Sequence, residues 1–269
     1  MAKLYEAKGR PRFNPLIAHV ADLEAAQACG AFDARALALA EAFWPGPLTL
    51  VVPSHGEQVS DLARAGLDTV ALRAPRHPLA QALLYAVDRP LVAPSANRSG
   101  RPSPTRFADA MEETGAAAAM GLDGGDCPVG VESTVVACLD GPPRLLRPGG
   151  LERSAIEAVV GPLAEAETDA RRSPGRLALH YAPDAPVRID AAAPRPGEAY
   201  LAFGPAPDTP SVFNLSPAGD LHEAAANLVA YLREADRLRP AAIAVAPIPA
   251  DGLGEAINDR LKRAAGFVG

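Results

Sequence analysis

Several absences narrow the class of this 269-residue chain before any motif is considered. It has three cysteines, Cys29, Cys127 and Cys138, and no two form the C-x-x-C pair of a zinc ribbon or a thioredoxin-type site. So few cysteines suit a reducing compartment, and we expect a cytoplasmic protein. No apolar run approaches the roughly 18 residues of a membrane span. Charged residues follow Met1, where a signal peptide would have an apolar core.

Lysine and aromatic residues are also scarce. Lysine occurs only at Lys3, Lys8 and Lys262, and the other basic residues are arginine. Aromatic residues make up 5% of the chain, which disfavours the stacking platform of a single-strand nucleic-acid binder. The formal net charge of −6 predicts no global attraction to nucleic acid, although a local basic patch can still bind one.

Strand and helix signals alternate along the chain and predict an α/β protein. Apolar and β-branched runs predict strands over 15–20, 48–53, 69–75, 90–97, 132–139 and 143–149, with helices over 2–9, 21–29, 34–44, 77–87, 103–115 and 152–160. Further on, strands over 198–204, 211–216 and 241–248 alternate with helices over 220–239 and 252–265. We predict a domain over residues 1–160, a linker over 161–186 and a small α/β domain with a partly parallel sheet over 187–269.

Helix ends carry local signals of their own. Gly9 follows the first helix in a position that glycine favours because it accepts a positive φ. Ser103 or Thr105 is expected to cap the helix over 103–115. Asp220 and Glu223 form the D-x-x-E pattern of a capping box at the start of the helix over 220–239.

The first of four polar clusters is KGRPRFNPL, residues 8–16. Lys8, Arg10 and Arg12 lie there on a proline-stiffened turn after a helix. Three cations held close together suit a phosphate chain or a carboxylate. A solvated basic turn explains the same residues equally well, because exposed cations often contribute little.

The second cluster is APSANRSGRPSPT, residues 93–105, which follows an apolar strand. Its side-chain hydroxyls and amide belong to Ser95, Asn97, Ser99, Ser103 and Thr105, and with free backbone N–H groups they can bind phosphate oxygens or a ribose. The alternative is a polar turn that caps the next helix. No Walker or Rossmann glycine pattern occurs here, so neither fingerprint would hold a nucleotide.

The third and fourth clusters lie at strand ends. Ser133 opens an apolar strand, and on local grounds an ordinary strand start explains it better than a binding site. Arg73 and Arg147 end apolar strands just before a proline, as anion clamps or as edge residues whose charged ends reach water. His19, within the apolar run LIAHV, fits a hydrogen-bonded core residue better than a metal ligand.

Taken in chain order, these clusters resemble a known family. KGRPRFNPLIAHV, FWPGPLTLVV, VALRAPRHP, PLVAPSANRSGRPSPT, VGVESTVV and RLLRPGG follow the order of the YrdC/Sua5 family. SPGRLALHYAP and GLGEAINDRLKRAA resemble the linker and last helix of its longer, Sua5-type members. The resemblance spans essentially the whole chain. It implies a YrdC-like twisted mixed sheet with a concave cavity, followed by a small Rossmann-like α/β domain.

The family implies threonylcarbamoyl-AMP synthase, a nucleotidyltransferase that forms threonylcarbamoyl-AMP and diphosphate from L-threonine, bicarbonate and ATP. The product feeds the N6-threonylcarbamoyladenosine modification of tRNA. The implied partners are therefore the downstream threonylcarbamoyl transferase machinery, with tRNA itself a candidate, and no membrane. The resemblance also implies that Mg²⁺ accompanies ATP with few dedicated protein ligands.

Carried over position by position, the resemblance assigns the site residues. The signature set of the cavity is Lys8, Arg10, Ser95 and Asn97. Positions that match ATP contacts are Arg10, Asn14, Thr69, Ser95, Ser103, Arg147 and, in the linker, Tyr181. Positions near threonine are His19, Arg73, Ala93 and Ser133. Scattered cations and hydroxyls, without a catalytic triad, agree with a transfer that depends on positioning and charge.

One family motif has no counterpart in the chain. Family members carry a P-T-[DE]-T-V-Y-G-L-like motif ahead of the K-G-R-P turn, and its threonines line the cavity; no such motif occurs here. We therefore expect a loss of part of the threonine side and little synthase activity. The alternatives are a tRNA-binding module or an inactive remnant that binds ATP or threonine. Carbamoyl transfer of the hydrogenase-maturation type is disfavoured because zinc-finger cysteines are absent.

Overall fold

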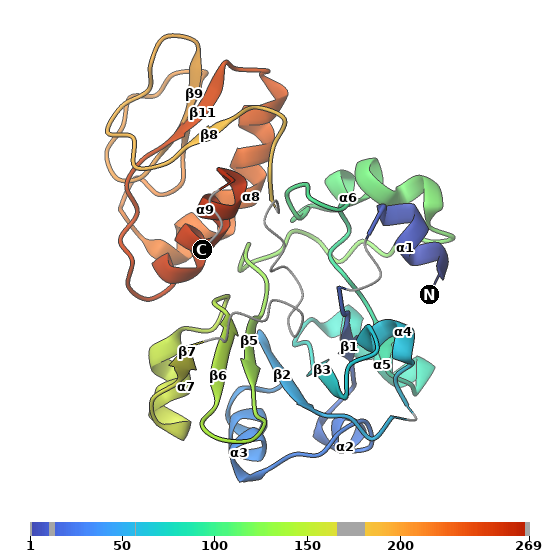
Figure 1. Ribbon diagram of the computed structural model, residues 1–269. Coiled ribbons are helices and arrows are strands. Elements are labelled where there is room, and N and C mark those ends of the chain that lie inside the picture. The colour runs from blue at the N-terminus through green and yellow to red at the C-terminus, as the bar shows by residue number, and fades with distance from the viewer. Residues whose placement is uncertain (1, 11–13, 57, 166–180, 267–269) are drawn as a thin grey trace. The chain divides into compact units, whose positions relative to one another are not determined.

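The computed structural model describes residues 2–10, 14–56, 58–165 and 181–266 (Figure 1). They form two compact units, each made from separate stretches of the chain. The first unit comprises residues 1–6, 10–94 and 132–176, and the second comprises 7–9, 95–131 and 177–269. The segment over 95–131, which carries part of the second polar cluster, therefore packs with the last third of the chain.

The first unit is built on a mixed sheet whose strands lie in the order β4–β1–β3–β2–β5–β6–β7. The strands are β1 Ile17–His19, β2 Leu48–Pro53, β3 Thr69–Arg73, β4 Leu91–Val92, β5 Thr134–Ala137, β6 Arg144–Arg147 and β7 Ala164–Glu165. β1 is parallel to β3 and β2 to β5, whereas β2–β3 and β5–β6 are antiparallel. Each strand predicted in this part of the chain is present, and the short β7 was not predicted.

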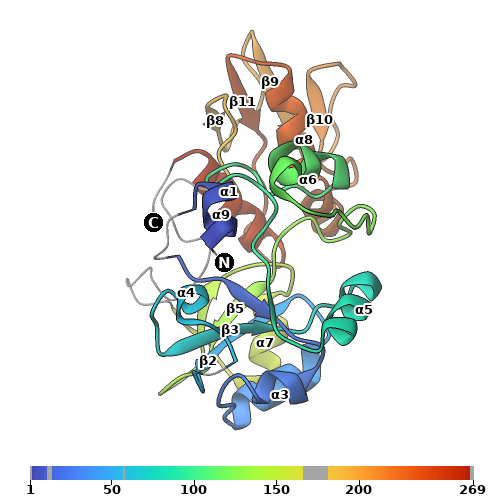
Figure 2. The ribbon, with the colours of Figure 1, turned by 90° about the vertical axis from the view of Figure 1, so that its right-hand side faces the viewer.

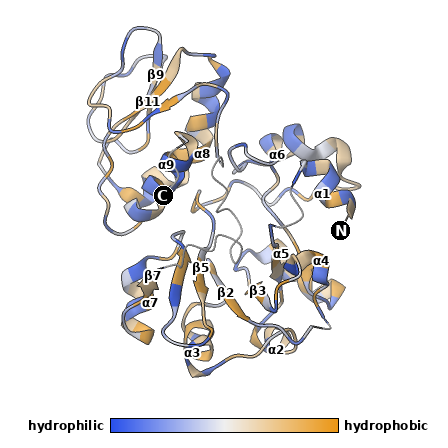
Figure 3. Cartoon of the chain, viewed as in Figure 1, coloured by the Kyte–Doolittle hydropathy of each residue, from blue (hydrophilic) through white to orange (hydrophobic). Residues whose placement is uncertain are grey.

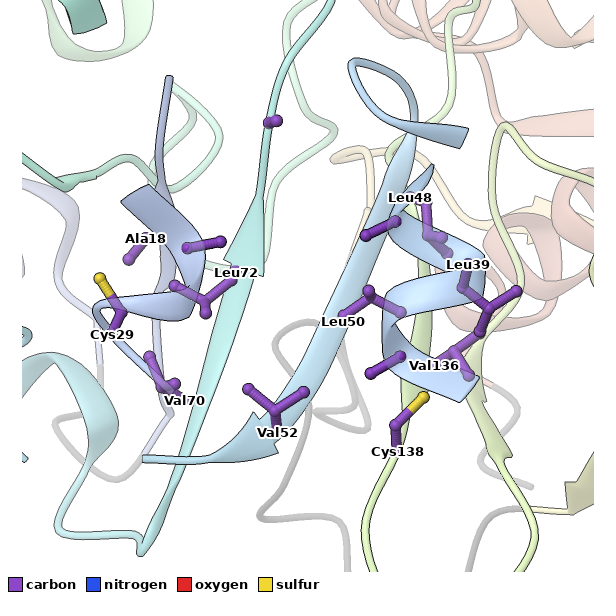
Figure 4. Close-up of a cluster of buried hydrophobic side chains, with 14 of the residues drawn as sticks. Ala18, Cys29, Leu39, Leu48, Leu50, Val52, Val70, Leu72, Val136 and Cys138 are labelled. Carbon is purple, nitrogen blue, oxygen red and sulfur yellow. The ribbon is translucent and has the colours of Figure 1, made fainter. Parts of the chain in front are cut away.

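Some of the helices of this unit pack on one face of its sheet. The helices of the unit are α2 Leu23–Gln27, α3 Ala34–Phe43, α4 Asp61–Arg64, α5 Pro78–Val87, α7 Arg153–Val160 and most of α1 Ala2–Lys8. Leu39 of α3 packs with Leu50, Leu72 and other apolar strand residues into the main core (Figure 4). Ile156 of α7 belongs to the same core. Together with a smaller apolar cluster on the other face, this core explains the near-continuous apolar runs along β2 and β3, whose apolar residues are orange in Figure 3.

The other face of the same sheet carries smaller side chains and the candidate polar residues. Val51, Ala71 and Val135 form its apolar part. Because side chains alternate along a strand, Arg73 lies on the same face as Ala71. His19 is the register partner of Arg73 and lies on that face as well. The alternation therefore separates a packing face from a face that carries chemistry.

The second unit has a four-stranded sheet of its own, in the order β10–β9–β11–β8, and its described strands are all parallel. They are β8 Val187–Arg188, β9 Glu198–Ala202, β10 Val212–Asn214 and β11 Ala242–Val245. The helices are α6 Phe107–Thr114, which runs into a 3₁₀ turn Gly115–Ala117, α8 Leu221–Arg237 and α9 Gly254–Ala264. Apolar residues of α8 and α9 pack against β9 and β11. The predicted small α/β fold with a parallel sheet is confirmed.

Two predicted helix caps differ in detail from the structure. α6 begins at Phe107, and Arg106 occupies the N-cap position without a side-chain cap, so the predicted cap by Ser103 or Thr105 is wrong. The chain is still extended there, because the carbonyl of Thr105 accepts a hydrogen bond from the amide of Cys127 at 2.9 Å. The helix can therefore start only beyond it.

The cap of α8 forms as predicted, with one intermediary. Asp220 accepts a hydrogen bond from the amide of Glu223 at 2.7 Å. Glu223 does not return the bond to Asp220 directly. Its carboxylate accepts from the hydroxyl of Ser216 at 2.5 Å, and that hydroxyl oxygen accepts from the amide of Asp220 at 2.9 Å. The serine completes the capping box.

The predicted linker over 161–186 falls partly outside the described residues. At its start, β7 pairs in parallel with β6. At its end, Tyr181 is buried in the core of the second unit.

Replacing Leu228 of α8 with alanine is expected to lower the free energy of unfolding of the second unit by about 2–5 kcal/mol, because its side chain is 1% exposed and leaves a cavity. Leu238→Ala at the end of the same helix is the control, since Leu238 is 54% exposed and should change stability by less than about 0.5 kcal/mol. Urea unfolding of both variants measures the difference. Equal losses would show that Leu228 does not belong to a packed core.

Candidate functional site

His19 and Arg73 lie side by side at one edge of the first unit. They end the parallel strands β1 and β3 and are register partners. Nε of Arg73 donates to the carbonyl of Gly46 at 3.0 Å, and the amide of Gly46 donates to the carbonyl of Ala74 at 2.9 Å. A Cβ at Gly46 would lie 2.1 Å from the carbonyl oxygen of Phe43, so the turn requires glycine. The F-W-P-G-P turn thus orients the arginine.

His19 is uncharged at neutral pH. Burial of its ring and then the positive charge of Arg73 lower the pKa of His19 to about 4. Nδ1 of His19 has no hydrogen-bond partner in the part of the chain that the structure describes. A neutral imidazole therefore offers one free ring nitrogen beside a cation.

Ser133 is the centre of a second polar group in this unit. Its hydroxyl lies 2.7 Å from the hydroxyl of Thr49 on β2. Nη2 of Arg147 donates to the carbonyl of Ser133 at 2.8 Å and lies 3.3 Å from its hydroxyl. Gly149 allows this approach, because a Cβ there would lie 2.5 Å from the carbonyl carbon of Ser133. The structure thus joins two motifs that are 14 residues apart.

The other predicted residues of the first unit are less closely grouped. Nη2 of Arg10 donates to the carbonyl of Pro15 at 3.0 Å. Asn14 is buried, and its Nδ2 has no hydrogen-bond partner among the described residues. The amide of Ala93 pairs with the carbonyl of Ile17 at 3.2 Å, which places Ala93 beside β1.

Thr69 lies at the other end of β3 from Arg73, about 13 Å away for an extended strand. Thr69 lines a groove of about 720 Å³ together with Asp33, Arg144 and other residues near its own end of the strand. The structure therefore does not bring Thr69 together with His19 and Arg73, although alternation puts the three on one face.

The second unit contains the rest of the predicted signature set. Lys8 is buried, and its Nζ donates to the carbonyl of Ser95 at 2.6 Å and to the carbonyl of Asn97. The hydroxyl of Ser95 donates to Oδ1 of Asn97 at 2.5 Å, and Nδ2 of Asn97 donates to the carbonyls of Arg98 and Arg101 at 2.7 and 2.9 Å. The amide of Ser99 closes the contact by donating to the carbonyl of Lys8 at 2.8 Å. Lys8 thus forms one cluster with two residues that lie 87 and 89 positions further along the chain, Ser95 and Asn97.

Tyr181 and Ser103 also belong to the second unit. The guanidinium of Arg260 lies over the ring of Tyr181, 5.1 Å from its centroid. Tyr181 has a φ of +65°, a left-handed conformation that β-carbon-bearing residues rarely adopt, and is 2% exposed. Ser103 is buried. Contact of either residue with ATP stays a prediction.

Two residues of these clusters were missed in the sequence. Thr49 is the one hydroxyl residue in the strand run LTLVVP, and that position was the available signal. Glu113 of α6 accepts a hydrogen bond from the amide of Arg98 at 3.0 Å, directly after Asn97. Nothing in the polar pattern of α6 distinguishes Glu113 from its exposed neighbour Glu112.

Metal-ligating and membrane-spanning features were searched for as well. Within the described ranges, no group of three or more His, Cys, Asp and Glu side chains is arranged to hold a metal ion. No described helix combines the length and apolar character needed to cross a membrane.

A mixed seven-stranded sheet with one helix-covered face, accompanied by a unit with a parallel sheet, defines a two-part α/β protein with cations and hydroxyls gathered by loops. The Sua5–YciO–YrdC family model, described as telomere recombination, matches residues 1–149. The C-terminal domain model of threonylcarbamoyl-AMP synthase matches residues 151–266. The chain belongs to the Sua5–YciO–YrdC family.

Relatives in this family extend over nearly the whole chain. A threonylcarbamoyl-AMP synthase of Bacillus subtilis is 38% identical over 98% of this chain and 83% of its own length. One of Pyrococcus abyssi is also 38% identical, over 98% of this chain and 84% of its own length. The crystal structure of P. abyssi Sua5 complexed with L-threonine matches with a TM-score of 0.90 at 36% identity, covering 99% of this chain and 84% of that chain. The predicted fold class is confirmed.

The uncharged state of His19 predicts a specific pH dependence of stability. As the pH falls from 6.5 towards 4, the unfolded chain binds a proton at His19 that the folded protein does not. The free energy of unfolding should therefore fall by up to about 1.4 kcal/mol per pH unit over this window. His19→Gln should flatten the curve there, whereas His55→Gln, at an exposed position, should not. Urea unfolding between pH 7 and 4 tests this, and parallel curves for wild type and His19→Gln would refute it.

Proposed function

We propose that this chain is an L-threonylcarbamoyladenylate synthase, which forms threonylcarbamoyl-AMP and diphosphate from L-threonine, bicarbonate and ATP. The observation that carries the proposal is 38% identity over 98% of the chain to two proteins named threonylcarbamoyl-AMP synthase. A relative with the same fold has been crystallised with L-threonine. The comparisons lend no support to the alternatives of a tRNA-binding module or an inactive remnant.

The reaction would proceed in two bond-forming steps. The amine of L-threonine attacks bicarbonate and loses water, which gives a carbamate. A carbamate oxygen then attacks the α-phosphorus of ATP, and the bond from that phosphorus to the bridging oxygen of the diphosphate breaks. Negative charge accumulates at the α-phosphate in this transition state, so fixed cations would accelerate the reaction.

The group around Arg73 suits the amino acid. An arginine guanidinium is a planar donor that matches a carboxylate, and here the Gly46 carbonyl holds it in place. The neutral His19 lies beside this guanidinium without competing for the negative charge of a carboxylate. Ser133 supplies a hydroxyl that lies between Thr49 and Arg147. We propose that these residues bind the carboxylate and hydroxyl of L-threonine.

The cluster around Lys8 suits the nucleotide. The Lys8 ammonium is oriented by two carbonyl oxygens, those of Ser95 and Asn97. A fixed ammonium is the kind of group that binds a phosphate oxygen. Arg10, Asn14 and Arg147 would supply further donors in the same reaction.

Mg²⁺ would accompany ATP through phosphate oxygens and water, as this ion usually does. The hydroxyl oxygen of Ser95 and the amide oxygen of Asn97 are hard donors of the kind that Mg²⁺ accepts. The two atoms are hydrogen-bonded to each other at 2.5 Å. The ion would neutralise phosphate charge. The product would pass to a threonylcarbamoyl transferase that modifies tRNA in the cytoplasm.

Lys8→Met should lower kcat by about 10²–10³-fold, because the variant keeps the length of the side chain and loses the charge next to the transferring phosphate. Lys3→Met, at an exposed position of the same helix, should leave kcat unchanged. Diphosphate release with ATP, L-threonine and bicarbonate measures both. The wild-type rate in this assay also tests the expectation, drawn from the missing motif, that the chain has little synthase activity. An undiminished rate in Lys8→Met would contradict the assignment of the Lys8 cluster to ATP.

Arg73→Lys should raise KM for L-threonine by about ten- to a hundredfold with a smaller effect on KM for ATP, because lysine cannot reproduce the paired hydrogen bonds of a guanidinium. Arg76→Lys, three residues on and exposed, is the matched control. A change in KM for ATP alone would move Arg73 to the nucleotide.

A further inference from the structure

A buried carboxylate supports the loop that carries Asn97. Glu113 lies on α6 in the second unit, and its side chain is 2% exposed. It accepts hydrogen bonds from the amide of Arg98 at 3.0 Å and from Nη2 of Arg233 at 3.1 Å. Burial alone would raise the pKa of Glu113, but the bonds from Arg98 and the charge of Arg233 lower it below the ordinary value. Glu113 is therefore an ionised, paired carboxylate at neutral pH.

The end of α6 fixes the backbone on both sides of Asn97. The hydroxyl of Thr114 donates to the carbonyl of Ala96 at 3.1 Å, and Glu113 holds the amide of Arg98. The Arg98 amide belongs to the same peptide group as the Asn97 carbonyl, to which Nζ of Lys8 donates. The orientation of the Lys8 ammonium thus depends on the contacts that Glu113 and Thr114, at the end of α6, make with the loop.

Arg233 of α8 ties this support to the opposite end of the loop. Its side chain is 8% exposed. Nη2 bonds to Glu113, while Nη1 donates to the carbonyl of Pro102 at 3.0 Å. One planar guanidinium therefore bridges the carboxylate behind Arg98 and the backbone at Pro102. A lysine ammonium in this place can make the first bond and lacks the fork that makes the second.

The same helices carry further ion pairs. Oδ2 of Asp236 on α8 lies 3.9 Å from Nη2 of Arg101 in the loop, whereas Arg237 pairs with α6. Arg237, one turn further along α8, bonds to Asp109 at 2.5 Å and to Glu112 at 2.9 Å, and its side chain is 49% exposed (Figure 2 shows α6 beside α8). Arg237 thus contributes to the docking of α6 on α8 through Asp109 and Glu112.

We propose that Arg233 is a positioning residue of the synthase reaction, which holds residues 95–102 in the shape that presents Lys8, Ser95 and Asn97 to the nucleotide. The inference rests on the proposed function. It assigns to α8, in the last third of the chain, a part in catalysis that involves no contact with substrate.

The test compares Arg233→Ala and Arg233→Lys with Arg237→Ala in the full chain. Arg233→Ala should lower kcat by about 10–100-fold, the cost of a small misplacement of a catalytic group, with KM for L-threonine near the wild-type value. Arg233→Lys should fall between wild type and Arg233→Ala. Arg237→Ala should lose less than about twofold, because exposed ion pairs contribute little.

Amide hydrogen exchange, followed by NMR, provides a readout that does not depend on turnover. The amides of Arg98 and Ser99, both hydrogen-bonded in the structure, should exchange at least about tenfold faster in Arg233→Ala and at the wild-type rate in Arg237→Ala. If Arg233→Ala fails to fold, Arg233→Lys with a native melting temperature takes its place in both measurements.

Equal losses of kcat in Arg233→Ala and Arg237→Ala, or unchanged exchange at Arg98 and Ser99, would overturn the proposal. A wild-type chain without synthase activity would overturn the proposed function instead. Hydrogen exchange would then still decide whether Arg233 holds the loop.

Discussion

The structure of the candidate site depends on one kind of contact: a cationic side chain that donates to the backbone carbonyl of a loop. Lys8 does so at Ser95 and Asn97, Arg73 at Gly46, and Arg147 at Ser133. A carbonyl carries a dipole and no net charge, so it directs the cation without forming an ion pair with it. The turns rich in proline and glycine are then understandable, because a rigid turn offers a carbonyl in a fixed direction.

The first unit could be predicted well from the sequence, and the reason is its packing. β2 and β3 are buried on both faces, so their runs are apolar and β-branched, and both were located to within two residues. The predicted strands β9 and β11 of the second unit are likewise short and mostly buried, whereas β10 is half-buried. The cap of α6 could not be predicted, because a long-range backbone bond at Thr105 keeps that stretch extended, and local side-chain preference cannot report on a partner 22 residues away.

The candidate site was only partly readable for a related reason. The first two polar clusters of the sequence contain Lys8, Ser95 and Asn97, and the structure places these three residues together. The residues that support them were missed. Glu113 and Arg233 lie 120 positions apart on helices with many charged residues, so nothing in either helix marks them as buried partners. Thr69 shows the opposite limit, because a position that matches a family motif lies at the far end of its strand from Arg73.

The contacts of Arg233 also determine when, during synthesis of the chain, the loop over 95–102 can gain its support. Its bond to Pro102 joins residues 131 positions apart. Ribosomes add roughly 5–20 residues per second, so the loop over 95–102 leaves the ribosome on the order of ten seconds before the arginine that holds it has been made. Over that interval the α6 carboxylates lack Arg233 and Arg237 as partners, so these contacts can form only once α8 has been made.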